Sequence, residues 1–317
     1  MPDDRARGDG ASGDGVTPTA HTAHTAPVGD RRRRGSTDEA RGTLVLIGGG
    51  ARPEGRALGA FLDLAGARDG GLVVGLTTAS GDPRGSANAW RRDFAVAGAT
   101  NVVMPVVARR EEARDPRLAA LVREARGIFL GGGDQIKLIA TLGGTAVGDA
   151  IRDAFLDGAT VCGTSAGAAA LTKTTLANGE VDAAGALVEM YIGPGLGLLG
   201  YHTMIDTHFA ERRRLHRLFV AIAGYPELMG LGIDEDTALV VRGHVGEVTG
   251  RGGVTFVDGR TVEYDNAGEV RARGDHLTLS YLRVGIVGAG HALNLREREL
   301  EEVVRRRGEP ATARIAP

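Results

Sequence analysis

Cysteine and lysine are both scarce in this chain. Among its 317 residues there is one cysteine, Cys162, which excludes an internal disulfide framework and any metal site built from several thiolates, and which is typical of a reducing compartment. Lysine occurs only at Lys137 and Lys173, so arginine supplies nearly all of the 38 basic side chains. We attribute the arginine bias to codon usage, and the cysteine count predicts a cytoplasmic protein.

The chain also lacks a net charge of either sign and a long hydrophobic run. Its formal net charge is −2 and its pI is near 6.5, whereas a nucleic-acid or anionic-membrane partner would favour a clustered basic excess. No stretch of about 20 apolar residues could span a bilayer, and the N-terminal segment has no apolar core of a secretory signal. We therefore expect neither nucleic acid nor membrane as a partner.

Residues 1–42 show no hydrophobic periodicity. They are rich in Gly, Asp, Ala, Thr and Pro, and they carry the run Asp30-Arg31-Arg32-Arg33-Arg34. This composition is typical of a disordered tail, although the arginine run could also be an interaction element. We predict a tail over 1–42 and a single folded domain over 43–317.

After residue 43, short apolar runs alternate with stretches of helical periodicity. The runs end in glycine or other small residues, and they cover 43–47, 72–77, 101–107, 127–130 and 159–162; a helical pattern over 86–97 precedes the third. Such units are typical of parallel strands joined by helices that cover both faces of the sheet. The sequence predicts an α/β fold with a mainly parallel central sheet.

From about residue 237 the pattern changes to short alternating strands with glycine turns. The Asp258-Gly259 pair is a strong signal for a hairpin turn, and residues 296–307 have the pattern of a helix. We predict an antiparallel C-terminal extension of the same domain, followed by this helix.

The segment Gly163-Thr164-Ser165-Ala166-Gly167 matches the pattern G-x-S-x-G. It lies between an apolar strand and an alanine-rich helical segment, which is the setting of a nucleophile elbow. In such an elbow the serine occupies a strained turn, and its Oγ is exposed at a helix N-terminus that favours developing negative charge. The motif favours Ser165 as a nucleophile; the alternative is an ordinary turn in which the serine caps the helix.

A serine nucleophile needs a base. The best candidate is His208, because it follows an apolar run and precedes a helical pattern, and α/β active sites gather where strands end and helices begin. That pattern repeats at helical spacing through Leu215, Leu218, Phe219 and Ile222. His202 in the same segment is the alternative, and a single histidine is more often structural than catalytic.

The base in turn needs an orienting acid. The segment 232–238 carries three consecutive carboxylates, Asp234, Glu235 and Asp236, beside an apolar run. If the segment is extended, its side chains alternate between two faces, so only one or two of them could reach the histidine. Spacing does not choose among the three, and a solvated acidic loop is an open alternative.

Four arginines follow His208 in what we expect to be the first turns of a helix: Arg212, Arg213, Arg214 and Arg217. Positive charge there opposes the helix dipole by up to about 1 kcal/mol per charge, so a compensating anion is expected. It is either Asp206 together with Glu211, or a substrate carboxylate held in a bidentate fork.

We also expect different roles for these arginines. At helical spacing, Arg212 would pack its stem on the core side, whereas Arg214 and Arg217 would lie near each other. If the latter two bind substrate, replacing either with alanine would raise KM and change the melting temperature little.

Four motifs, taken in this order, resemble the cyanophycinase family of serine peptidases. They are Gly131-Gly132-Gly133-Asp134-Gln135, the elbow at 163–168, the block Asp206-Thr207-His208-Phe209 with its arginines, and the acidic segment 232–238. The resemblance covers about residues 43–290. It implies a three-layer α/β/α fold related to class I glutamine amidotransferases and aspartyl dipeptidases, and a single catalytic domain over 43–317.

The resemblance also implies an activity. Members of the family cut cyanophycin, a poly-aspartate with arginine on each β-carboxyl, into β-Asp-Arg dipeptides, and they are homodimers that need neither a metal nor another cofactor. It implies that Ser165 is the nucleophile, His208 the general base and Glu235 the orienting acid. The implied substrate-binding residues are Gln135, Asp206, Thr207, Arg212, Arg214 and Arg217, and Thr207 stands where the family usually has glutamine.

We place the oxyanion hole at the backbone N–H groups of Ala166 and Gly133, because backbone donors need the close approach that glycine permits.

Three functions stay open: a peptidase acting on cyanophycin, a related peptidase acting on another aspartyl or isoaspartyl peptide, and a non-catalytic binding protein with the same fold. The third is disfavoured, because serine, histidine, acid and arginine block are all present.

Overall fold

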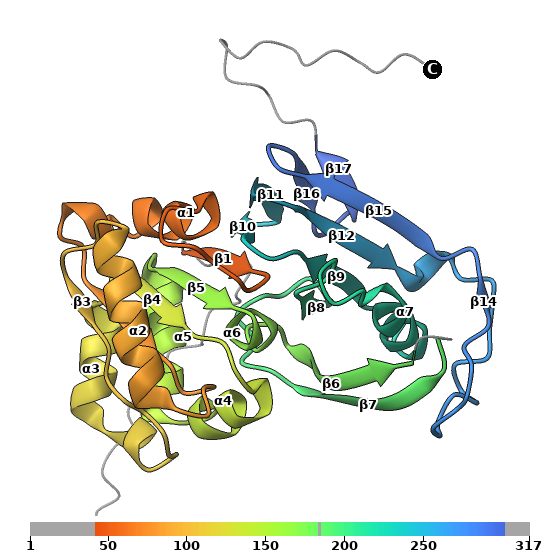
Figure 1. Cartoon of the computed structure of the whole chain (residues 1–317), viewed down its shortest axis with the longest axis horizontal. Coiled ribbons are helices and arrows are strands. Elements are labelled where there is room, and N and C mark those ends of the chain that lie inside the picture. Colours follow the sequence, from red (N-terminus) through yellow and green to blue (C-terminus); the bar gives the residue numbers. More distant parts are fainter. Residues whose placement is uncertain (1–41, 183–184, 302–317) are drawn as a thin grey trace, which may run out of the picture. The chain divides into compact units, whose positions relative to one another are not determined.

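A nine-stranded sheet forms the centre of the computed structural model, which describes residues 42–182 and 185–301 (Figure 1). Its strand order is β17-β16-β11-β10-β1-β5-β4-β2-β3. The parallel strands are β1 (Thr43–Ile47), β2 (Val73–Leu76), β3 (Val102–Val103), β4 (Gly127–Leu130) and β5 (Thr160–Thr164). The predicted tail lies, except for Gly42, outside the described residues.

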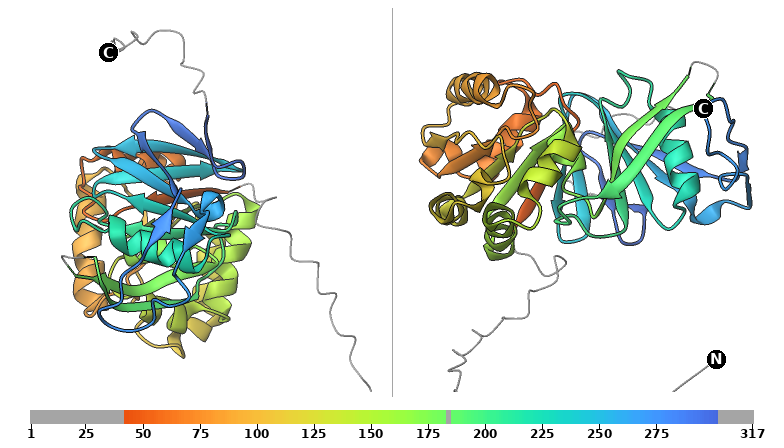
Figure 2. Two further views of the ribbon diagram at one scale, coloured as in Figure 1. Left: turned by 90° about the vertical axis from the view of Figure 1, so that its right-hand side faces the viewer. Right: turned by 90° about the horizontal axis from the view of Figure 1, so that it is seen from below.

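Helices cover both faces of these parallel strands, as predicted (Figure 2). On one face, Leu44 and Leu46 share a core with α3 (Pro116–Glu124) and α5 (Ala146–Asp157). On the other, Val45 and Ile47 pack with α1 (Arg56–Leu64) and α2 (Pro83–Val96). Every residue of β1 is buried because successive side chains of one strand point into opposite layers.

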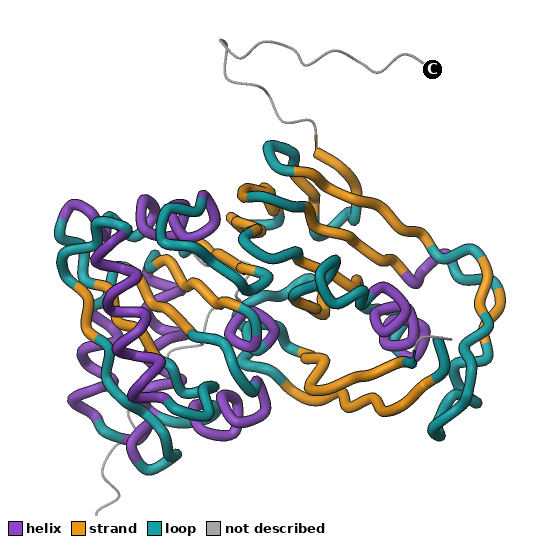
Figure 3. Tube along the Cα trace, in the orientation of Figure 1, coloured by secondary structure: helices purple, strands orange, loops and turns teal. Residues whose placement is uncertain are grey.

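The antiparallel extension is also present. Strands β10 (Thr237–Arg242), β11 (Val245–Gly250), β16 (Ala292–Asn294) and β17 (Glu299–Glu301) continue the large sheet beyond β1. Strands then predominate over helices in this part of the chain (Figure 3). The fold is therefore the predicted α/β architecture, with an addition that the sequence did not predict.

That addition is a second sheet with the order β15-β12-β9-β8. Its strands are β8 (Thr203–Thr207), β9 (Met229–Ile233), β12 (Gly253–Asp258) and β15 (Arg283–Gly288). One face shares the core of the large sheet, through residues such as Leu231 and Val254. The other face packs against α7 (Leu215–Gly224), where Leu218 and Ile222 meet Val257.

Smaller elements surround the second sheet. An antiparallel hairpin, β6 (Thr174–Val181) with β7 (Leu187–Pro194), lies on the far side of α7 from β12. The pair β13 (Tyr264–Asp265) and β14 (Leu279–Ser280) flanks a long loop, and the short helices α4 (Gln135–Leu142) and α6 (Ala166–Ala169) follow β4 and β5. Among the residues described, no helix combines the length and the apolar character needed to cross a membrane.

Two local predictions are wrong. Asp258-Gly259 does not form a hairpin: β12 ends at Asp258 and passes into a 3-10 turn at Gly259–Thr261. The buried Asp258 carboxylate instead accepts hydrogen bonds from Arg260 and, over 2.5 Å, from Arg298 Nη1. The tight turn between adjacent strands is at residues 243–244, where β10 meets β11.

The helix predicted over 296–307 is also wrong as far as Glu301. Arg298 has a positive φ of 63°, which a right-handed helix does not accommodate, and the residues that follow form β17 against β16. Residues 302–307 lie outside the described part of the chain.

Candidate active site

Ser165 lies in a sharp turn between β5 and α6. Its φ is 51° and its ψ is −119°, a conformation that costs free energy for a residue with a side chain. A Cβ at Gly163 would lie 2.4 Å from the Gly167 carbonyl oxygen, and a Cβ at Gly167 would lie 2.1 Å from the Leu130 carbonyl oxygen. The turn therefore needs both glycines of the motif, as a nucleophile elbow does.

The Ser165 hydroxyl is directed at a histidine. It makes no capping hydrogen bond to α6, although the residue occupies the N-cap position. Instead, Oγ lies 2.9 Å from Nε2 of His208, and Nδ1 of His208 lies 2.6 Å from Oε1 of Glu235. The arrangement is a continuous hydrogen-bonded chain from hydroxyl to imidazole to carboxylate, which is the geometry of a nucleophile, a base and an orienting acid.

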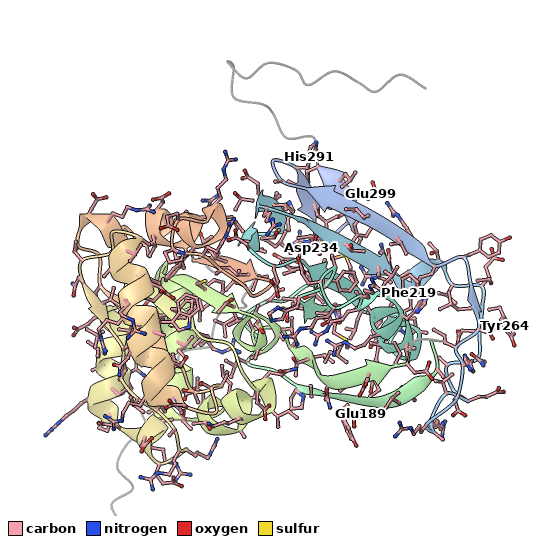
Figure 4. The ribbon with its side chains drawn as sticks, in the orientation of Figure 1. Glu189, Phe219, Asp234, Tyr264, His291 and Glu299 are labelled. Carbon is pink, nitrogen blue, oxygen red and sulfur yellow. The ribbon has the colours of Figure 1, made fainter. Side chains whose placement is uncertain are left out.

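Among the residues that the structure describes, the alternative base and the alternative acids make no hydrogen bond to Ser165 or His208. His202 precedes β8 while His208 follows it, so the two histidines lie at opposite ends of one strand. Asp234 accepts hydrogen bonds from the N–H groups of Ala210 and Gly253, and Figure 4 labels its position between β9 and β12. Asp236 pairs with Arg52, Nε to Oδ2 at 2.7 Å. Of the three acids, Glu235 is the one that bonds to His208.

The end of β1 and the two glycines after it hold the backbone of the site in place, which the sequence did not predict. Three consecutive carbonyls accept hydrogen bonds: Ile47 from Ser165 N–H at 2.9 Å, Gly48 from His208 N–H at 2.7 Å, and Gly49 from Asp236 N–H at 2.8 Å. Gly49 also lies against the imidazole, because a Cβ there would be 2.2 Å from His208 Cε1. The signal available in the sequence was Gly48-Gly49-Gly50 directly after a buried strand.

A second glycine loop lies beside the nucleophile. A Cβ at Gly132 would lie 3.7 Å from Ser165 Oγ, whereas the atoms nearest to Gly133 belong to Ala79 and Ser80. The structure thus brings Gly132 next to Ser165, and the Gly133 N–H stays the predicted second donor of the oxyanion hole. Asp134 N–H donates to the Ala79 carbonyl over 2.9 Å, so the loop is fixed to the turn that follows β2.

The predicted helix does not begin at His208. Residues 208–214 form turns in which His208 and Arg213 have φ values of 51° and 52°, and α7 begins at Leu215. Arg212 is exposed in these turns, so the expectation that its stem packs on the core side of a helix is wrong. The left-handed residues let the chain reverse direction between His208 and α7.

Arg214 and Arg217 share a buried carboxylate. Asp206, at the end of β8, accepts from Arg217 Nε over 2.8 Å and from Arg214 Nη1 over 3.2 Å, and its side chain is 1% exposed. Burial lowers the pKa of the Arg214 guanidinium to about 10, while the Asp206 carboxylate opposes that change; the group stays charged at neutral pH. Of the two carboxylates expected to compensate the arginines, Asp206 does so, whereas Glu211 accepts from Glu235 N–H.

The other predicted binding residues bond to β6 or to the residues around Asp206. Gln135 Nε2 donates to the carbonyls of Leu176 and Ala177 on β6, over 2.8 and 2.7 Å. Arg217 Nη1 donates to the Gly179 carbonyl of β6 over 2.6 Å. Thr207 is buried between Asp206 and His208, and its carbonyl accepts from Arg214. Asp206, Thr207, Arg214 and Arg217 thus connect β8, β6 and α7, Gln135 joins α4 to β6, and Arg212 is exposed.

Arg217→Ala is expected to lower the free energy of unfolding by about 2 kcal/mol, because it leaves a buried carboxylate short of partners. This reverses the expectation from sequence that the substitution changes KM alone. Arg212→Ala is the matched control, and it should leave stability unchanged because its side chain is exposed. Urea titrations measure both, and equal unfolding midpoints for the two variants would contradict a structural role for Arg217.

Cys162 is expected to be inert in the folded protein. It lies on β5 three residues before Ser165 and is fully buried, and burial raises the pKa of its thiol well above the usual value. A thiol that is neither ionised nor accessible reacts slowly with disulfide reagents. Titration with Ellman's reagent at pH 8 should therefore detect no thiol in the native protein and one in guanidinium chloride. Rapid labelling of the native protein, with loss of activity, would make Cys162 a rival nucleophile.

The described residues include no cluster of three or more histidine, cysteine, aspartate or glutamate side chains that could hold a metal ion. The site as it stands consists of Ser165, His208 and Glu235, two glycine loops and the Asp206 network. Such an arrangement can attack a carbonyl carbon and stabilise the resulting negative charge with backbone N–H groups.

Comparison with known proteins gives consistent results. A model of the family described as Peptidase family S51 matches residues 44–249. A cyanophycinase of Synechococcus elongatus is 34% identical over 263 residues, covering 81% of each chain. A cyanophycinase of Trichormus variabilis is 35% identical over 277 residues, covering 85% of this chain and 91% of the other. The crystal structure of a peptidase from an acI-B1 actinobacterium aligns with a TM-score of 0.60 at 21% identity, covering 81% of this chain and 98% of that one, and it supports the fold.

Proposed function

The chain belongs to peptidase family S51 and is a cyanophycinase-like serine peptidase, and from this we propose that it is an exopeptidase that releases β-Asp-Arg dipeptides from cyanophycin. We propose Ser165, His208 and Glu235 as its catalytic triad. The observation that carries the proposal is the hydrogen-bonded chain from Ser165 Oγ through both ring nitrogens of His208 to Glu235, at 2.9 and 2.6 Å.

In the first half of the reaction, Ser165 Oγ attacks the scissile carbonyl carbon while its proton passes to His208 Nε2. Glu235 holds the other ring nitrogen in its protonated form and stabilises the imidazolium that develops. The carbonyl oxygen becomes an oxyanion, and we assign its stabilisation to the backbone N–H groups of Ala166 and Gly133. Collapse of the intermediate breaks the C–N bond, and His208 gives its proton to the leaving amine.

In the second half, water attacks the ester of Ser165. His208 takes one proton from the water, a second tetrahedral intermediate forms, and the ester bond breaks as the proton returns to Ser165 Oγ. The product carries the new carboxylate and the enzyme is regenerated. No group outside the triad and the two backbone donors is needed for the balance of atoms and charge.

For the binding of substrate, the geometry distinguishes among the six residues implied by the resemblance. Arg212 is exposed, and Arg214 keeps Nε and Nη2 free of any hydrogen bond recorded between described residues. Arg217 and Gln135 instead donate to Asp206 and to backbone carbonyls. We therefore assign carboxylate recognition to Arg212 and Arg214, and we assign to Asp206, Arg217, Thr207 and Gln135 the positioning of β8 and β6 around the site.

The rival function is hydrolysis of another aspartyl or isoaspartyl peptide, and Thr207 in place of the family's glutamine is the observation that favours it. Incubation of the purified chain with cyanophycin, with β-Asp-Arg and with α-Asp-X dipeptides tests both. Mass spectrometry should detect β-Asp-Arg accumulating from cyanophycin, and both kinds of dipeptide should stay uncleaved. Cleavage of the dipeptides alone would replace the proposed substrate with the rival, and cleavage of none would favour a binding protein.

We further propose that the enzyme is a cytoplasmic homodimer. The single buried cysteine supports a reducing compartment, and the resemblance to the cyanophycinase family supports the dimer. Light scattering after gel filtration should give twice the 32.9 kDa mass of the chain. A mass equal to one chain would overturn the dimer without affecting the proposed chemistry.

A further inference from the structure

A cavity of about 480 Å³ lies apart from the triad. Strand β7, the C-terminal end of α7 and a loop at residues 267–277 line it, and Figure 1 shows these three elements side by side. The volume is in the range of ligand-binding sites. None of its lining residues belongs to the triad, the glycine loops or the Asp206 network, so the function proposed above does not use it.

The cavity lies along one edge of β7. That strand pairs with β6 on its other edge, and the two form a sheet of their own. On the cavity side, Leu187 exchanges hydrogen bonds with Asp275 and Gly274, but from Val188 to Ile192 none of the strands that the structure describes pairs with this edge. An open strand edge offers alternating N–H and C=O groups to an extended peptide.

The side chains around this edge favour a ligand that carries both positive and negative groups. Tyr191 and Tyr225 line the cavity and are 58% and 39% exposed, and tyrosine faces attract guanidinium and ammonium groups. Glu189, on the same side of β7 as Tyr191 because strand side chains alternate, adds a carboxylate whose Oε1 accepts a hydrogen bond from Asn178 of β6, and Figure 4 shows Glu189 at the hairpin. Arg271 and Arg273 from the facing loop add two donors for carboxylates.

On the basis of the function proposed above, we propose that this edge is a second binding site for polymeric substrate, where a distant segment of the same chain is held while its end is cleaved at Ser165. The polymer matches the site in three ways: its backbone is a peptide, and each repeat carries a guanidinium and a carboxylate. Helix α7 connects the two sites, since its N-cap Arg214 binds Asp206 and its last residue Gly224 lines the cavity.

The distance between the two sites predicts that KM depends on the length of the substrate. The ten residues of α7 span about 15 Å, which is the length of about four or five extended repeats. A substrate of two repeats could occupy the triad but not both sites. The second site would therefore lower KM for long polymer only.

The test compares the full-length wild type with the double variant Tyr191→Ala/Tyr225→Ala on cyanophycin and on a soluble oligomer of two repeats. We expect KM for cyanophycin to rise about tenfold in the variant and KM for the oligomer to stay unchanged. Tyr264→Ala is the matched control, since this tyrosine is 60% exposed and does not line the cavity. Equal changes for both substrates, or no change for either, would overturn the second site.

A binding measurement separates this proposal from the proposed function. Protein with Ser165→Ala is sedimented with insoluble cyanophycin, with and without the two tyrosine substitutions. Loss of sedimentation in the tyrosine variant supports the site even if the wild type cleaves neither substrate, an outcome that would overturn the function alone. Equal sedimentation with and without the two tyrosines would overturn the second site. A wild-type dimer that becomes a monomer after the double substitution would also overturn it, because the edge would then be a subunit interface.

Discussion

Ser165→Ala should lower kcat by a factor of about 1,000 or more, with no measurable loss of stability. The substitution removes the one atom that forms the covalent intermediate, and loss of a triad nucleophile leaves only the contributions of substrate binding and the oxyanion hole. Stability should hold because Oγ bonds to the partly exposed His208 and not to α6. Hydrolysis of cyanophycin and thermal melts give both quantities.

Ser280→Ala on β14 is the control for a serine outside the site. If Ser165→Ala kept more than about a tenth of the wild-type kcat, the nucleophile would have to be another residue. Thr164 would then be the first to test, because the expected inertness of Cys162 removes the thiol from consideration.

Gly49→Ala should reduce kcat by about 100-fold or more, although the residue takes no part in the chemistry. Its new methyl group would lie 2.2 Å from His208 Cε1, far inside van der Waals contact, so the imidazole must move by 1 Å or more. A displacement of about 1 Å at a reacting group costs about 100-fold in rate. Because His208 accepts the Ser165 proton, kcat should fall more than KM rises.

Gly70→Ala separates the steric effect from backbone strain. Gly49 and Gly70 have φ values of 98° and 85°, but a Cβ at Gly70 meets nothing within 4 Å. The positive φ should therefore cost each variant about 1 kcal/mol of stability, and only Gly49→Ala should also displace the imidazole and lose activity. Similar kcat values for the two would show that the imidazole does not depend on the absence of a side chain at residue 49.

The parallel core could be predicted from sequence because its strands are buried on both faces. Runs such as 43–47 and 127–130 are almost entirely apolar and are followed by glycine, and two neighbouring layers of helices follow from that pattern. The elbow around Ser165 was predictable for a related reason: its two glycines are required by contacts with backbone atoms close by in the fold. The pattern G-x-S-x-G contains both glycines, so it could be recognised even though the Leu130 carbonyl beside Gly167 belongs to another strand.

The wrong predictions, and the choice among three acids that spacing left open, share a different cause. Asp258 ends its strand with a buried ion pair whose partner, Arg298, is 40 residues away, so a turn signal two residues long could not reveal it. The start of α7 depends on left-handed conformations at His208 and Arg213, which only a small minority of non-glycine residues adopt. The choice of Glu235 over Asp234 and Asp236 depended on where β9 ends relative to β8, and spacing along one segment does not contain that information.

The three adjacent carbonyls of Ile47, Gly48 and Gly49 have a consequence for how the protein loses activity. They hold the amides of Ser165, His208 and Asp236, which come from segments far apart in sequence, at and directly after the end of a central strand whose residues are all buried. An amide bonded in this way exchanges its hydrogen only when that strand separates from its neighbours, which requires opening of the whole domain. In deuterated solvent the three amides should therefore exchange at one common slow rate, and heat inactivation should coincide with global unfolding instead of preceding it.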